Sequence, residues 1–310
     1  MVQRLDIAHC VRASPAMRHS LAIAVAMLTL GAVWGLTPAM AKLAMAQGMK
    51  PLGVATIAAA ISAATLLGIA AWQRETPRWT RPHLIHYGAG GLVGLALANL
   101  FAFTGLSRAP AGLFALLVPL SGLLSTVFFA MAGLERATPR IVAGTLLGVC
   151  GVALAMAPGA ALPDRTMLPW AALMVLTPVC YAASNLLSVK LAVPGSTPLA
   201  QAAGTLAGAT VSVLLMALAL GQLGTPPSLA IWMLLVAQGV LTALAYLIYF
   251  RLLVGTGGMV TSQVSYLITL AGLLYGYLLF DEVPGLLTLP AAGLIFAGLA
   301  LVTLSKRQPA

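Results

Sequence analysis

The sequence has 310 residues, of which 61% are hydrophobic and only 7% are charged, and its mean hydropathy is +1.01. So few polar groups cannot cover a water-exposed surface, which excludes a soluble globular domain and predicts a polytopic membrane protein. The net charge of +10 does not indicate a nucleic-acid partner, because the basic residues are scattered singly between apolar runs.

Apolar segments long enough to cross a bilayer, at about 20 residues each, follow one another along the whole chain. They lack the alternation of polar and apolar residues that is typical of membrane barrels, so we expect an all-α protein. Two of the divisions between spans rest on short polar stretches, 135–140 and 281–285. The ten predicted spans are 20–46, 52–72, 84–106, 111–133, 140–158, 169–190, 198–220, 229–253, 259–280 and 285–304.

The start of the chain also has features of a secretory signal. Arginines precede the apolar run from Leu21, and Ala39-Met40-Ala41 has the small-residue spacing of a cleavage site. The run is long for a signal and continues past that site, so we interpret it as the first span. The predicted organisation is a cytoplasmic segment 1–19, repeats at 20–158 and 169–304, a connecting loop 159–168, and a cytoplasmic tail 305–310.

Lysine and arginine residues predict the orientation. With the N-terminus in the cytoplasm, four of the sixteen fall outside: Lys42, Lys50, Arg108 and Arg165. The other twelve lie on the cytoplasmic side, as expected from the positive-inside rule. Both termini are therefore predicted to be cytoplasmic.

The two halves of the sequence contain a repeated pattern. Residues 112–155 and 258–303 both run from a glycine through an apolar helix and an acidic hinge to a Gly-rich apolar helix. Because five spans is an odd number, the second half enters the membrane upside down relative to the first, as in many secondary transporters. We therefore expect ten transmembrane helices in two inverted five-helix repeats, with a solute site between them.

Several motif residues recur in a characteristic order across both halves: Trp34-Gly35, Lys42, Pro119, Glu135-Arg136, Gly144, Gly148, Gly151, Glu282, Gly293 and Gly298. In this order they resemble the EamA-type, ten-helix branch of the drug/metabolite transporter superfamily. The resemblance covers about residues 20 to 304. One departure is Thr269, which stands where the ninth helix of that family often has proline.

The resemblance implies a permease of the bacterial inner membrane, commonly an exporter of amino acids or other small metabolites, that works by alternating access. An exporter of amphipathic drugs with broad specificity is an alternative, and a non-transporting scaffold or a channel is another. The sequence has no HExxH, no GxSxG and no paired buried carboxylates, so an enzyme is not expected. The expected partners are a small solute and lipid, without cofactor or nucleic acid.

The stretch from Trp34 to Lys42 contains candidate residues of the solute site. Pro38 leaves the carbonyl near Trp34 without its usual helical partner, which predicts a kink or a polar opening. Gly35 permits close approach of a backbone or a ligand, and Lys42 would attract anionic solute groups. Packing and interface anchoring are the alternative roles for these residues.

Polar residues within the other spans are few. Because an unpaired polar group in lipid is costly, they are expected to face the bundle interior, either lining the cavity or bonding helix to helix. Tyr181 and Asn185 share a helix face, and so do Gln263 and Tyr266. The predicted solute contacts are Trp34, Lys42, Asn99, Tyr181, Asn185, Gln238, Tyr246, Gln263 and Tyr266, with Gly35, Pro38 and Pro119 as hinge or gating residues.

Every carboxylate lies at a helix end or in a loop, and the nearest candidates for proton coupling are Glu135 and Glu282. Each has a competing role in ending its helix or pairing with an arginine, so uniport, exchange and proton coupling remain open. The three cysteines show no metal-ligand spacing. Glycine pairs spaced by four predict close helix packing within a monomer, or a weak homodimer: Gly90–Gly94, Gly144–Gly148, Gly204–Gly208 and Gly272–Gly276.

Overall fold

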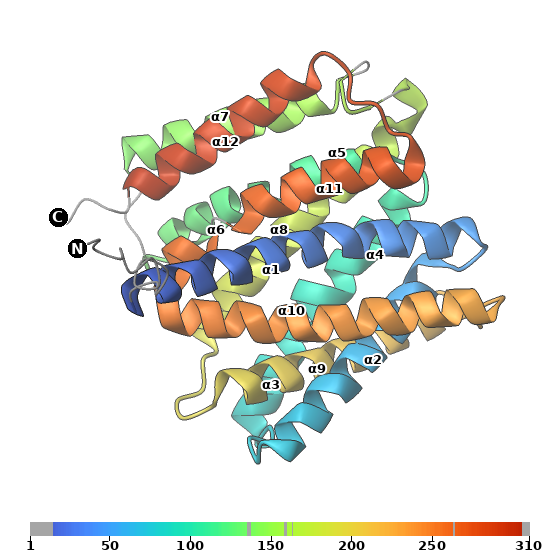
Figure 1. The fold of residues 1–310 in the computed structure, drawn as a ribbon, viewed down its shortest axis with the longest axis vertical. Helices are drawn as coiled ribbons and strands as arrows, with labels where there is room; N and C mark the ends of the chain where they lie inside the picture. Colours follow the sequence, from blue (N-terminus) through green and yellow to red (C-terminus); the bar gives the residue numbers. More distant parts are fainter. Residues whose placement is uncertain (1–14, 135–137, 158–159, 163, 263, 306–310) are drawn as a thin grey trace, which may run out of the picture.

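The computed structural model describes residues 15–134, 138–157, 160–162, 164–262 and 264–305. Within these ranges the fold is all-helical and has no strand, and its long helices pack side by side (Figure 1). The first half contains α1 (Pro15–Ala46), α2 (Pro51–Trp72), α3 (Arg81–Gly91), a π-helical segment (Leu92–Leu97), α4 (Ala98–Leu106), α5 (Ala111–Leu117), α6 (Leu120–Met131) and α7 (Pro139–Ala155). The second half contains α8 (Leu168–Lys190), α9 (Pro198–Ala219), α10 (Leu229–Ser262), α11 (Val264–Phe280) and α12 (Thr288–Ser305).

These elements form ten rods, because α3 continues through the π-helical segment into α4, and α5 continues into α6. Among the described residues, seven helices are long and apolar enough to cross a membrane, and three shorter apolar helices complete the set. The shorter ones are α7, α11 and α12. The fold is therefore the predicted all-α membrane protein with ten helices.

One predicted boundary is wrong. The eighth span was expected to end at 253 and the ninth to begin at 259, but α10 is helical to Ser262 and α11 begins at Val264. The intervening residues include Gly255, Gly257 and Gly258, and each glycine weakens a helix by about 1 kcal/mol. In the apolar setting of a bundle, the backbone hydrogen bonds of a continued helix outweigh that preference.

Contacts between the two halves follow an exchange pattern. If each rod of the first half is swapped with the corresponding rod of the second, the pair α1–α11 becomes α6–α8, and α2–α10 becomes α3–α9. The pairs α7–α12, α5–α11 and α2–α9 map onto themselves, and Figure 1 shows α7 beside α12 and α5 beside α11. The first and second halves therefore pack around an approximate two-fold relation.

Glycines allow several of these helices to approach closely. A Cβ added to Gly151 would lie 2.8 Å from the carbonyl of Ala291, and Gly144 and Gly298 face each other's backbone, so α7 and α12 meet through glycine. Gly204 and Gly208 make room for the ring and backbone of Tyr87. These contacts confirm the prediction that the glycine pairs pack helices within one chain.

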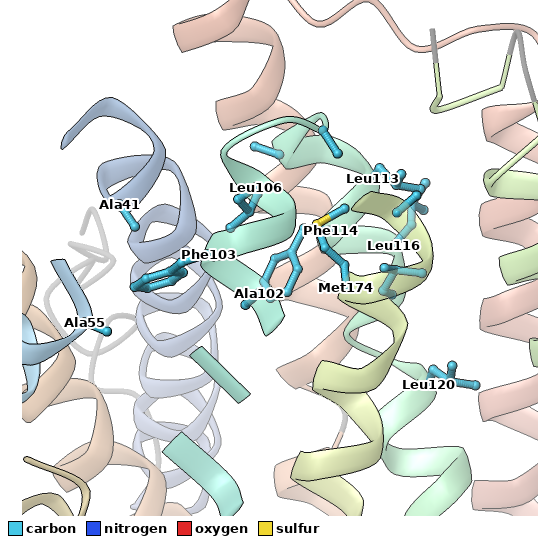
Figure 2. Packing of buried hydrophobic residues seen from close by; sticks show 14 of the residues in the cluster. Ala41, Ala55, Ala102, Phe103, Leu106, Leu113, Phe114, Leu116, Leu120 and Met174 are labelled. Atoms are coloured by element: carbon cyan, nitrogen blue, oxygen red, sulfur yellow. The ribbon is translucent and has the colours of Figure 1, made fainter. Parts of the chain in front are cut away.

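The main core cluster draws residues from both halves, among them residues of α1, α2, α4, α5 and α8. Figure 2 shows Phe103 of α4 beside Ala41 and Ala55, while Phe114 of α5 lies near Met174 of α8. Small side chains on α1 and α2 leave space for the aromatic ring between them, which is the usual route to dense packing. This core fixes α1 and α5 beside each other and so positions the candidate site.

Candidate functional site

An aromatic cluster surrounds Trp34 in the middle of α1. The Trp34 ring lies 5.7 Å from that of Tyr246 in an edge-on arrangement and 5.3 Å from that of Tyr249. Phe250 extends the cluster, with ring centroids 5.4 Å from Tyr249. All four side chains are half-buried, so α1 and α10 together present a flat, apolar surface with polar edges.

The local sequence of α1 explains how Trp34 is held. Gly31 and Gly35 are one turn apart and let α11 approach, since a Cβ on Gly35 would lie 2.7 Å from Ala271 and 3.0 Å from the nitrogen of Gly272. The predicted close approach at Gly35 is therefore made by a helix of the second half. With α11 packed on one face of α1, Trp34 packs with Ile268 and with Tyr249 of α10.

The carbonyl that Pro38 leaves without a helical donor has a side-chain partner in this structure. Pro38 cannot bond the carbonyl of Trp34, four residues earlier, and the Thr37 hydroxyl donates to that oxygen at 3.2 Å. Proline is tolerated in membrane helices where a neighbouring hydroxyl satisfies the freed carbonyl in this way. The helix α1 is accordingly continuous from Pro15 to Ala46.

Beside Trp34 and Pro38 lies a small cavity between α1, α5 and α11. Its volume is roughly 10 Å³, which is room for about one water molecule. The residues that line it are Trp34, Gly35, Pro38, Ala111, Phe114, Ala115, Val118, Ile268 and Gly272. In this conformation the space between the two halves is closed at this level.

Lys42 and Glu282 form an ion pair above this cavity. The Nζ atom of Lys42 donates to Oε1 of Glu282 at 2.6 Å and to the carbonyl of Ala109 at 3.0 Å. Glu282 in turn accepts from the backbone nitrogens of Ala111 and Gly112, each at 2.8 Å. Only 21% of the Lys42 side chain and 17% of the Glu282 side chain are exposed.

The surroundings of this ion pair hold both groups in place. The Lys42 ammonium lies 4.7 Å from the centroid of the Phe280 ring, a favourable cation–π position. Gly276 leaves space for the carboxylate, since an added Cβ would lie 2.7 Å from Oε2 of Glu282. One charge pair thus joins α1 and α5 of the first half to the end of α11 in the second.

Glu282 was expected to end its helix or to pair with an arginine. It lies just after the end of α11 at Phe280, but its partner is Lys42, and it also accepts hydrogen bonds from the first backbone nitrogens of α5. The Lys42 charge, predicted to attract a solute, is compensated in this conformation. Whether either group also contacts solute or protons stays a prediction.

Pro119 interrupts the fourth rod, and its freed carbonyl has a partner from the other half. Helix α5 ends at Leu117 and α6 begins at Leu120. The hydroxyl of Thr269 on α11 lies 2.9 Å from the carbonyl of Ala115, the residue four before Pro119, and 3.0 Å from that of Ser265. Thr269, the residue that departs from the family pattern, therefore faces the break that Pro119 makes.

Two of the predicted solute contacts, Tyr181 and Asn185, lie on α8. Tyr181 is half-buried. Asn185, one turn further on, donates from Nδ2 to the hydroxyl of Ser125 on α6 at 2.9 Å and remains exposed. The Asn185 side chain thus points toward α6.

The remaining predicted contacts are dispersed. Tyr266 packs edge-on against Phe296 of α12, with centroids 4.9 Å apart, and donates to its carbonyl at 3.3 Å. Gln238 is buried in α10, and its Oε1 has no hydrogen-bond partner among the described residues. Asn99 is half-buried in α4. Gln263 and Glu135 lie outside the described residues.

Two residues of the site were not among the predicted solute contacts. Tyr249 was expected only as one of the polar residues that face the bundle interior, and its ring lies tilted against that of Trp34. Its three-residue spacing from Tyr246 places both tyrosines on one helix face. Thr37 was missed although Thr-Pro pairs offer a hydroxyl next to the freed carbonyl. In the part of the chain that the structure describes, no group of His, Cys, Asp and Glu could hold a metal ion.

This chain is similar to known proteins in sequence and in fold. The model of the EamA-like transporter family matches residues 21–157 and 168–304, once for each half. A search of curated proteins found no match. A solved structure described only as a crystal structure of a protein is 20% identical, with a TM-score of 0.64 over 93% of this chain and 99% of that one. That likeness shows a shared fold.

Proposed function

Because this chain belongs to the EamA-like transporter family, we propose that it carries a small solute across the membrane by alternating access between its two halves. The family is one of multi-pass membrane transporters, which supports a transport function over catalysis. We further propose export of amino acids or related small metabolites across a bacterial inner membrane. Both termini would then face the cytoplasm, as the distribution of basic residues predicts.

The observation that carries this proposal is the contact between halves at Lys42 and Glu282. Two sequence-distant charges, one from each repeat, hold α1, α5 and α11 together beside a cavity too small for a solute. A closed end stabilised by a single ion pair is what one state of an alternating-access cycle requires, because the pair can be broken without unfolding either half.

The opposite orientation of the halves is part of the proposal, and the packing supports it. The exchange pattern of helix contacts is the pattern expected when two five-helix repeats are related by an axis in the membrane plane. The start of α1 and the end of α12 lie at the same end of the bundle, on the left in Figure 1. An even number of spans with both ends on one side is consistent with this arrangement.

Solute would bind beside the aromatic cluster. Trp34, Tyr246 and Tyr249 offer flat rings with hydrogen-bonding edges, so the site favours a solute with an apolar or aromatic part and a polar end. When Glu282 separates from Lys42, the ammonium becomes available to a carboxylate of the solute. The same rings would also accept amphipathic drugs, so broad-specificity drug export is the second candidate function.

Solute counterflow in liposomes tests the transport proposal. Purified protein would be reconstituted and loaded with one of several amino acids, nucleosides or cationic drugs, with and without a pH gradient. We expect accelerated exchange of at least one class, and the class distinguishes a metabolite exporter from a drug exporter. An effect of the pH gradient would indicate proton coupling, and its absence would favour uniport or exchange.

Variants at the proposed solute contacts test the site. The triple change Trp34→Ala, Tyr181→Ala and Tyr246→Ala should abolish counterflow, whereas Tyr275→Ala on α11 serves as an aromatic control outside the cluster. Unchanged flux in the triple variant would remove the site assignment. No flux of any solute in the unmodified protein would count against transport itself. Tag accessibility that places the two termini on opposite sides of the membrane would exclude the inverted arrangement.

A further inference from the structure

A second hollow lies far from the aromatic cluster, where α3 begins and α8 ends. It is a surface groove with a volume of roughly 470 Å³. In Figure 1 this region is at the lower left, toward the same end of the bundle as the start of α1. The residues that line it and bear on its chemistry are Arg81, Pro82, Ile85, Lys190, Leu191 and Val193.

Two histidines fix the walls of this groove. His83 and His86 are buried in α3. The Nε2 atom of His83 lies 3.0 Å from the hydroxyl of Ser196, and Nδ1 of His86 donates to the carbonyl of Leu191 at 3.1 Å. Both partners lie on the connection between α8 and α9. The groove is therefore held by hydrogen bonds between its two sides and does not depend on a ligand to form.

The groove has positive charge without a protein counter-charge. Arg81 and Lys190 line it from opposite walls, and both side chains are exposed. Neither forms an ion pair with any described residue of the chain, where Lys42–Glu282 is the pair found. An arginine offers a planar fork that matches phosphate oxygens, and a lysine adds a compact charge.

An exposed apolar side chain lines the same groove, and two more are its neighbours in sequence. Ile85 lines the groove and is 49% exposed, while Leu84, which precedes Ile85, is 50% exposed and Val189, which precedes Lys190, is 55% exposed. Leu84 and Ile85 belong to a helix long and apolar enough to span the bilayer, and Val189 belongs to another. Exposed aliphatic groups on such helices are expected to contact acyl chains, so the groove has cations at the membrane surface next to a surface for lipid tails.

We propose that this groove binds the phosphate-bearing headgroup of an anionic phospholipid. Arg81 and Lys190 would contact the phosphate from either side, and Ile85 and Val189 would contact the upper part of an acyl chain. A lipid is favoured over a free phosphate because the apolar side chains lie beside the cations and a soluble anion would leave them unused. Juxtamembrane basic pockets between helices are known to suit such headgroups.

Native mass spectrometry of the purified protein in detergent micelles tests this proposal. The protein would be titrated with dihexanoyl phosphatidylglycerol, with the neutral dihexanoyl phosphatidylcholine, and with inorganic phosphate. We expect a saturable one-to-one complex with phosphatidylglycerol and none with phosphatidylcholine. Because each basic residue contributes to anionic lipid attraction, the double variant Arg81→Gln, Lys190→Gln should bind phosphatidylglycerol roughly thirty-fold more weakly.

A charge-matched control is Arg74→Gln with Arg251→Gln, which removes two exposed basic residues outside the groove. This control should keep the affinity of the unmodified protein within about twofold. An equal loss in both double variants would overturn the proposal, since general attraction to positive charge would then explain binding. Competition by inorganic phosphate at the same concentration as the lipid would also overturn it, in favour of a free-anion site.

A second variant keeps the test valid if the double variant is poorly folded. Val193→Glu leaves both cations in place and adds a carboxylate at the groove wall. Binding of phosphatidylglycerol should fall at least tenfold, while the elution profile and thermal midpoint stay unchanged. Full binding by Val193→Glu would place the lipid elsewhere on the protein and contradict the proposal.

Discussion

The two ends of the bundle use lysine in opposite ways. At one end, Lys42 is mostly covered, paired with Glu282 and bonded to a carbonyl, and the cavity beside it holds roughly 10 Å³. At the other end, Lys190 is exposed beside Arg81 on a groove of roughly 470 Å³, without an acidic partner among the described residues. A lysine paired with a carboxylate therefore helps to close the interior, whereas a lysine without such a partner is available to an external anion.

The largest expected effect comes from breaking the covered pair. Glu282→Gln leaves the Lys42 ammonium without its counter-charge and weakens the bonds to Ala111 and Gly112. We expect a loss of about 2 kcal/mol in stability, below the range for fully buried pairs because both groups keep some exposure. Thermal unfolding in detergent micelles measures this as a midpoint lowered by several degrees.

Asp281→Asn is a matched control, because Asp281 is the neighbouring acid and asparagine tolerates its positive φ of 52°. It should change stability by less than about 0.5 kcal/mol. If Asp281→Asn and Glu282→Gln were equally destabilising, the contrast between the two ends would not rest on this ion pair. A double-mutant cycle with Lys42→Met should give a coupling energy well above experimental error.

A smaller effect is expected from Gly276→Ala, which keeps both charged residues but displaces the Glu282 carboxylate. The added Cβ would lie 2.7 Å from Oε2 of Glu282 and 3.2 Å from the nitrogen of Gly112, so the carboxylate has to shift. The expected cost is about 1–2 kcal/mol. Gly293→Ala on α12 meets nothing within 4 Å and should be neutral or slightly stabilising. Equal midpoints for the two variants would contradict the close fit.

A third prediction concerns Thr269 and the helix break at Pro119. Thr269→Val removes the hydroxyl that faces the carbonyl of Ala115, at an expected cost of about 1 kcal/mol. In a Pro119→Ala background the backbone nitrogen at 119 can bond that carbonyl, so the cost of Thr269→Val should shrink. The measurement is a thermal double-mutant cycle, and strict additivity would show that Thr269 does not serve the proline break.

The smallest effect is expected at the open end. In detergent without anionic lipid, Arg81→Gln with Lys190→Gln should alter stability by no more than about 0.5 kcal/mol, since both side chains are exposed and unpaired. Addition of phosphatidylglycerol should raise the thermal midpoint of the unmodified protein but not that of this variant. A large loss of stability without lipid would mean that these cations have structural partners.

Much of the fold was predictable because lipid imposes strong rules on sequence. Apolar runs gave the number of helices, and the repeated pattern in residues 112–155 and 258–303 indicated two halves. The boundary between α10 and α11 was misplaced, because the end of a helix inside a bundle depends on its packing as well as on local hydropathy. Within the site, Trp34 and Tyr246 were correctly expected to lie in the interior, whereas Tyr266 turned out to pack on α12.

The sequence alone determined that the protein lies in a membrane, that it is helical and that it has two repeats. The first two depend on composition and on the length of apolar runs, and the third on comparing two stretches of the sequence. Only the tertiary structure decided which groups meet. Lys42 and Glu282 are 240 residues apart, and Thr269 faces a carbonyl 154 residues away. Such partners depend on where helices cross and which side chains leave space there, and no local pattern encodes that geometry.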